Sequence, residues 1–138
     1  MYRKILVAYD GSDAGRKAFD AALELAAQQG SQLYVLTVAH PPDIGDDVET
    51  EAVIENSREH HRKLLAPLQR LSDASQVKAH FEVAVGHPAE QIIFHADRHG
   101  VDLIVVGHRG RSKFARLLLG SVSKQVVQYA ARAVMVVR

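Results

Sequence analysis

The chain has 138 residues with a formal net charge of +1, 47% hydrophobic residues and no cysteine. This length suits one domain with a sizeable core. The near-neutral charge gives no argument for a nucleic-acid or membrane partner. The lack of cysteine excludes disulfides, thiolate zinc sites and cysteine nucleophiles.

The amino-terminal segment does not predict export. The first four residues, MYRK, lead straight into a short apolar run at residues 5–9, which Asp10 ends. A secretory signal has a longer apolar region followed by a small-residue cleavage site. A membrane span needs roughly 20 apolar residues, and no stretch approaches that length. We therefore expect a cytoplasmic protein.

Five short, mainly apolar runs predict the strands of one sheet. Continuous apolar runs are typical of strands buried on both faces, as in a parallel sheet. The third run instead alternates, with Lys78, His80 and Glu82 on one side, and so predicts a half-exposed strand near a sheet edge. The five runs are residues 5–8, 33–38, 77–85, 103–106 and 133–137.

Helical patterns lie between these runs. Pro67 falls inside the second pattern, and we expect it to kink or divide that helix. The patterns are residues 14–25, capped by Ser12 or Asp13 and stopped by Gly30; 61–71, after a predicted loop at 40–47; 88–96, stopped by Gly100; and 122–130. The alternation of strands and helices predicts a single-domain α/β fold, with a mostly parallel sheet covered on both faces.

The segment after the fourth strand carries the clearest chemical signal. Ligands of open α/β sheets bind at the carboxyl ends of strands, which places Asp10, Val38 and the residues after Val106 near one site. Gly107 and Gly110 follow the end of a predicted strand. Because glycine has no side chain, backbone N–H groups there can approach an anion closely. The sequence Gly120-Ser121-Val122-Ser123 then opens a helix with unpaired N–H groups and a positive dipole end.

Cations separate these two anion-binding elements. Arg109, Arg111, Lys113 and Arg116 can offset phosphate charge, so the whole segment fits a polyphosphate better than a single phosphate. It is neither a Walker loop, since no GKS or GKT follows, nor the compact GxGxxG fingerprint. RNA is a weaker interpretation, because Phe114 is the one aromatic residue within this basic run.

The whole chain resembles the universal stress protein family, in particular its ATP-binding branch. The resemblance rests on four motifs: KILVAYDGS at residues 4–12, GHPA at 86–89, DLIVVG at 102–107, and the spacing G-x2-G-x9-G-[ST] met by Gly107, Gly110, Gly120 and Ser121. It implies a five-stranded sheet of order 3-2-1-4-5, commonly assembled as a homodimer. The chain departs from the family pattern at Ala133, where relatives often have proline, and at Pro67.

The resemblance also implies roles for individual residues. Asp10 would hold the ribose, and the backbone around Ala8 and Val38 would frame the adenine. The phosphates of ATP, attended by Mg²⁺ or Mn²⁺, would lie against the residues that meet the glycine-rich motif and the helix start: Gly107, Arg109, Gly110, Gly120, Ser121, Val122 and Ser123. Asp10 taken alone could equally be a turn or cap residue.

Two further features bear on function. His95 and His99 have the i, i+4 spacing of metal ligands on a helix, but no HExxH pattern accompanies them, so we expect a solvated or partly buried pair. No base and its orienting partner can be traced for catalysis. We therefore expect a nucleotide-dependent sensor or switch in stress response, with slow ATP turnover at most. The alternatives are a weak ATPase or autokinase, and a nucleotide-independent scaffold.

The last predicted strand indicates how the chain would assemble. Residues 133–137 are apolar and include neither a proline nor an inward-pointing charge that would prevent another strand from pairing with this edge. An unpaired edge is a template for another chain. We expect a homodimer in which two such strands pair about a two-fold axis. The other possibility is that the chain covers this edge itself.

Overall fold

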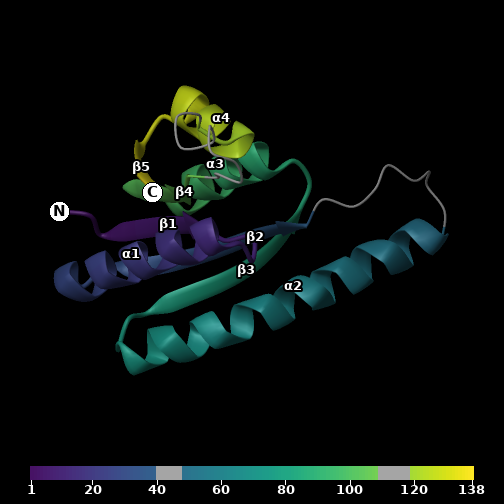
Figure 1. The fold of residues 1–138 in the computed structure, drawn as a ribbon, viewed down its shortest axis with the longest axis horizontal. Coiled ribbons are helices and arrows are strands. Elements are labelled where there is room, and N and C mark those ends of the chain that lie inside the picture. Colours follow the sequence, from purple (N-terminus) through teal and green to yellow (C-terminus); the bar gives the residue numbers. More distant parts are fainter. Residues whose placement is uncertain (40–47, 109–118) are drawn as a thin grey trace.

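The computed structural model describes residues 1–39, 48–108 and 119–138. These residues form a five-stranded, all-parallel sheet of order β3-β2-β1-β4-β5 (Figure 1), which confirms the predicted fold class and strand order. The predicted loop at 40–47 lies outside the described residues. The elements are β1 (Lys4–Ala8), α1 (Asp13–Gln29), β2 (Gln32–Ala39), α2 (Val48–Ala74), β3 (Ala79–Val85), α3 (Pro88–His99), β4 (Leu103–Gly107), α4 (Ser121–Tyr129) and β5 (Ala133–Val137).

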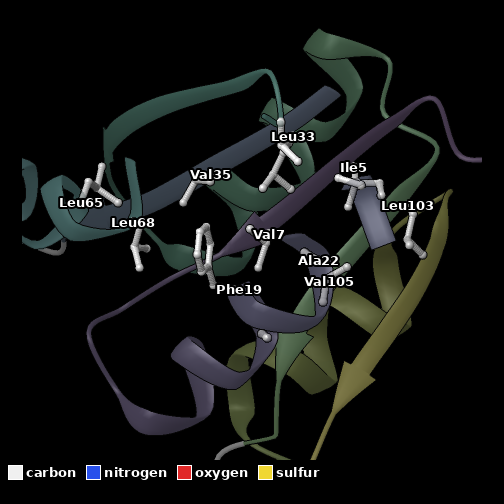
Figure 2. Close-up of a cluster of buried hydrophobic side chains, with 13 residues drawn as sticks. Ile5, Val7, Phe19, Ala22, Leu33, Val35, Leu65, Leu68, Leu103 and Val105 are labelled. Carbon is white, nitrogen blue, oxygen red and sulfur yellow. The ribbon is translucent and has the colours of Figure 1, made fainter. Parts of the chain in front are cut away.

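The sheet divides the interior into two apolar cores. Because successive side chains of a strand point to opposite faces, Val7 of β1 packs in the core under α1 and α2, whereas Leu6 packs in the core under α3 and α4. Figure 2 shows the first core, where the Phe19 ring of α1 points toward Val7 and Leu68 of α2 lies beside it. All four side chains are at most 1% exposed, so both faces of the central strand are sealed from water.

The ends of α1 follow the predicted signals. The Ser12 side chain accepts a hydrogen bond from the backbone N–H of Gly15 at 3.0 Å, which makes Ser12 the cap. Gly30 ends the helix in the left-handed conformation, which glycine adopts without a steric penalty. Among the described helices, none combines the length and hydropathy that a membrane crossing requires.

Of the two outcomes expected at Pro67, a kink or a division, α2 excludes the division. The helix runs from Val48 to Ala74 with Pro67 inside (Figure 1). Proline removes one N–H donor, but Pro67 is exposed, so water can satisfy the carbonyl group that loses its partner. Leu65 and Leu68, on either side of Pro67, are both buried against the sheet and hold the two halves in line.

Strand β3 is an edge strand, as predicted, and its polar side is partly covered. His95 and His99 of α3 contact Glu82, and Tyr34 of β2 stacks on His80, so both β3 side chains are only partly exposed. Burial lowers the pKa of His95, an effect only partly opposed by the nearby Glu82 carboxylate. Residues 79–85 are mostly intermediate in burial and Lys78 is exposed, which agrees with the predicted half-exposed strand.

A carboxylate ties β1 to the start of β4. The Asp102 carboxylate accepts hydrogen bonds from the backbone N–H groups of Arg3 at 2.9 Å and Lys4 at 3.0 Å. These bonds, that of Lys4 first, lower the pKa of Asp102 because they favour the ionised form. A lowered pKa contributes stability above the unfolded-state value, and that stability is lost as the pH falls through the folded-state value.

We expect Asp102→Asn to lower the urea midpoint at neutral pH, because the amide is a weaker acceptor than the carboxylate. The deficit should shrink as the pH falls below about 4, where the wild-type carboxyl group also becomes neutral. Asp73→Asn, at an exposed position on α2, serves as the matched control. A deficit that is constant from neutral to acid pH would contradict this assignment.

Candidate functional site

A cavity of about 440 Å³ opens at the carboxyl ends of β1, β2 and β4. This volume falls within the usual range for small-molecule sites, and its place matches the rule for open α/β sheets. Four helices contribute to its wall. The lining residues are Ala8, Tyr9, Asp10, Ser12, Ala14, Gly15, Leu36, Val38, Ser57, His61, Pro88, Ile92, Val106, Gly107, Val122 and Ser123.

The structure brings most of the predicted site residues to this cavity. Ala8, Asp10, Val38, Gly107, Val122 and Ser123 line it. Gly120 and Ser121 stand beside it, as the cap and the first residue of α4. Arg109 and Gly110 lie outside the described residues.

Asp10 is held at the cavity by the start of α1. Its carboxylate accepts hydrogen bonds from the Ser12 hydroxyl and, at 3.0 Å, from the Ser12 backbone N–H. A methyl group on Gly15 would lie 2.8 Å from the same carboxylate oxygen, so glycine permits this close approach to the helix. The positive end of α1 favours the charged carboxylate. Asp10 therefore acts as a turn residue and also presents a fixed acceptor to the cavity.

Gly107 has a packing role in the cavity wall. A methyl group there would lie 2.5 Å from the Ala14 carbonyl oxygen, closer than real contacts allow. The absence of a side chain thus lets the end of β4 press against the first turn of α1. The buried Ser123 hydroxyl donates a 2.7 Å hydrogen bond to the Gly107 carbonyl group and ties α4 to the same point.

The first turn of α4 offers N–H groups beside this point. The first intrahelical bond runs from Lys124 N–H to the Gly120 carbonyl group at 2.8 Å, so the N–H groups of Ser121, Val122 and Ser123 precede it. Gly120 has no side chain with which to cap them. Together with the helix dipole, these donors can bind an anion.

Sequence reasoning missed the contributions of α2 and α3. Ser57 and His61 of α2 and Pro88 and Ile92 of α3 line the cavity. The His61 Nδ1 atom lies 2.7 Å from the Ser57 carbonyl oxygen. A carbonyl oxygen only accepts, so Nδ1 carries the hydrogen and Nε2 of the neutral ring is an acceptor. The one signal in the sequence was the i, i+4 spacing of Ser57 and His61, which by itself indicates only a shared helix face.

The chain is similar to known proteins over its full length. The universal stress protein family model matches residues 1–138. Universal stress protein YxiE of Bacillus subtilis is 36% identical over 153 residues, with all of both chains covered. Universal stress protein MJ0531 of Methanocaldococcus jannaschii is 32% identical over 141 residues, with 100% of this chain and 83% of that protein covered.

Solved structures agree with the sequence comparisons. Universal stress protein UspA from Lactobacillus plantarum superimposes with a TM-score of 0.85 at 26% identity, covering 99% of this chain and 98% of that one. A universal stress protein solved in complex with cAMP superimposes with a TM-score of 0.78 at 26% identity, covering 99% and 97% of the two chains. The fold, the site at the sheet edge and these full-length matches agree: the chain belongs to the universal stress protein family.

Proposed function

We propose that this protein binds ATP in the cavity at the sheet edge and acts as a nucleotide-dependent sensor or switch. The observation that carries the proposal is the junction of an apolar cavity with the start of α4, where helical N–H groups precede the first intrahelical bond. Such a junction suits a ligand with a flat apolar end and an anionic end. The structural relative in complex with cAMP supports an adenine nucleotide.

The apolar part of the cavity would receive the adenine. Leu36 and Val106 contribute apolar surface from the sheet, and Ile92 contributes it from α3. The backbone at Ala8 and Val38, where β1 and β2 end, would supply hydrogen bonds to the ring edge. Asp10, held by Ser12 in a fixed orientation, would accept from the ribose hydroxyl groups.

The phosphates would extend from Gly107 toward the start of α4. The N–H groups of Ser121, Val122 and Ser123 would bind them, together with Arg109 and Gly110 from the part of the chain outside the described residues. Mg²⁺ or Mn²⁺ would accompany the phosphates. These ions need few protein oxygens beyond the phosphates themselves, and the Asp10 carboxylate and the exposed Ser121 hydroxyl are such oxygens nearby.

A switch role rests on where the ligand would bind. Asp10 in the turn before α1, Gly107 at the end of β4 and the start of α4 all border the cavity, so one nucleotide would bridge three segments that are far apart in the sequence. A weak ATPase is the second candidate, favoured by the acceptor Nε2 that the Ser57 contact leaves on His61. A nucleotide-independent scaffold would leave the cavity without a role. The expected cytoplasmic location stays a prediction.

The ribose assignment predicts a charge-specific loss of ATP affinity. Asp10→Asn keeps an acceptor for Ser12 but removes the carboxylate, so we expect calorimetry to show ATP affinity falling about tenfold or more. Asp13→Asn makes the same charge change on an exposed residue that does not line the cavity, and should leave the affinity unchanged. Equal losses in the two variants would contradict the assignment.

Phosphate release from bound ATP, abolished by His61→Gln, would favour the ATPase.

Substitutions of two serines in α4 should affect different properties, stability for Ser123 and ATP binding for Ser121. The Ser123 hydroxyl hydrogen is committed to Gly107, so Ser123→Ala should cost about 1 to 2 kcal/mol of unfolding free energy. Exposed Ser121 should contribute little to stability, and Ser121→Ala should instead weaken ATP binding about tenfold. Urea unfolding and calorimetry on both variants check this. A Ser121→Ala variant with wild-type ATP affinity would remove that hydroxyl from the phosphate site.

The homodimer is proposed through the open edge of β5. The N–H and C=O groups of one residue point to the same side of a strand, and the side alternates along it. The Val137 carbonyl group accepts from His108 N–H at 2.7 Å, so Val137 faces the β4 side. Val134 and Val136 therefore direct their backbone groups outward. Apolar Met135 is 38% exposed next to them, which suits a pairing surface.

Val136→Pro would remove an outward-facing donor without breaking the β4 ladder, and should disfavour pairing. Sedimentation velocity at tens of micromolar should show a wild-type dimer and a monomeric variant. Urea unfolding of the variant tests that the fold survives. A monomeric wild type, or a variant that stays fully dimeric, would contradict this interface.

A further inference from the structure

A second cluster of functional side chains lies beside the ATP cavity. Glu82 of β3 meets His95 and His99 of α3, and one ligand atom from each lies within 4.8 Å of the others. His95 Nδ1 is 2.8 Å from Glu82 Oε2, and His99 Nε2 is 2.9 Å from Glu82 Oε1. None of the three residues lines the cavity proposed for the nucleotide.

The contacts in this cluster are close but poorly directed. Although carboxylate oxygens lie within hydrogen-bond distance, His95 Nδ1 and His99 Nε2 make no hydrogen bond of acceptable angle among the described residues. His95 is only 8% exposed, so water does not readily replace the missing bond. Both ring nitrogens thus depend on the Glu82 carboxylate, which is itself partly exposed to solvent. A cation bound by both nitrogens and the carboxylate would satisfy all three groups at once.

We propose that Glu82, His95 and His99 form a binding site for a divalent transition metal, with Zn²⁺ as the best-fitting ion. Two imidazoles and one carboxylate are a ligand set that zinc uses in proteins, with a fourth position left to water. Bond lengths of about 2.0 to 2.1 Å place tetrahedral ligand atoms roughly 3.3 Å apart. The two histidine nitrogens now contact different oxygens of Glu82, at 2.8 and 2.9 Å, and the three ligand atoms lie within 4.8 Å of one another, so zinc binding would require side-chain shifts of about 1 Å.

The surroundings support ordered imidazole rings. Tyr34 of β2 stacks on His99 with a ring-centroid distance of 4.5 Å and on His80 with one of 4.8 Å. His80 shares the face of β3 with Glu82, and its buried Nε2 also makes no hydrogen bond among the described residues. Neighbours that fix ring orientation are what metal-binding histidines need. The i, i+4 spacing places both α3 histidines on the same helix face.

The test uses the whole protein, stripped of metal by a chelator and free of nucleotide. Calorimetry with zinc chloride should show one bound ion per chain, and cobalt should give the visible absorption of a tetrahedral site. Glu82→Gln and His99→Gln should each weaken zinc binding about tenfold or more, since even second-shell changes cost that much. His60→Gln, at an exposed histidine of α2, is the matched control and should bind zinc as the wild type does.

Urea unfolding, measured on the same variants, reports their folding without relying on nucleotide binding. Unfolding unchanged in Glu82→Gln, with zinc binding lost, supports the proposal independently of the proposed function. A wild type that takes up no zinc and gives no tetrahedral cobalt spectrum would overturn it. So would zinc affinity that is the same in Glu82→Gln, His99→Gln and His60→Gln.

Discussion

The sealed central strand β1 is the constraint on which the rest of the structure depends. Its residues pair in parallel with β2 on one side and β4 on the other, including Ile5 with both Leu33 and Leu103. Because Ile5 and Val7 are completely buried, and neighbouring Leu6 nearly so, neither face admits a polar ligand along the strand. Next to β1, a ligand can therefore be met only where the strand ends. There, helix starts bring N–H groups to the sheet edge.

The face of the sheet under α3 and α4 carries both candidate sites. Every second side chain of a strand lies on the same face of the sheet, and on β2 this face carries Tyr34, Leu36 and Val38. Tyr34 lies in the histidine cluster, whereas Leu36 and Val38 lie in the cavity. Helix α3 spans the same distance in the opposite direction: its start lines the cavity and its last residue, His99, joins the cluster. One strand and one helix thus position two chemically different sites.

The sequence alone determined the fold and the place of the main site. Buried parallel strands require continuous apolar runs, and helices require apolar residues with a 3.6-residue period. Both patterns can be recognised within a short stretch of sequence. The strand ends then located Asp10 and Gly107 at one edge, because parallel strands bring their carboxyl ends together. The family motifs predicted the adenine nucleotide that we propose as the ligand. The helix cap at Ser12 and the stops at Gly30 and Gly100 were equally local features.

Only the tertiary structure decided which distant side chains meet. Glu82 lies in β3 and His95 in α3, the next element, and no spacing rule links a strand residue to the helix that packs over it. The same holds for His61, which reaches the cavity from α2. Helix α2 continues through Pro67 because buried leucines on both sides hold it to the sheet. This packing energy comes from tertiary contacts and is not part of the local helix propensity. Local patterns determine elements, whereas packing between elements determines the contacts that give a site its chemistry.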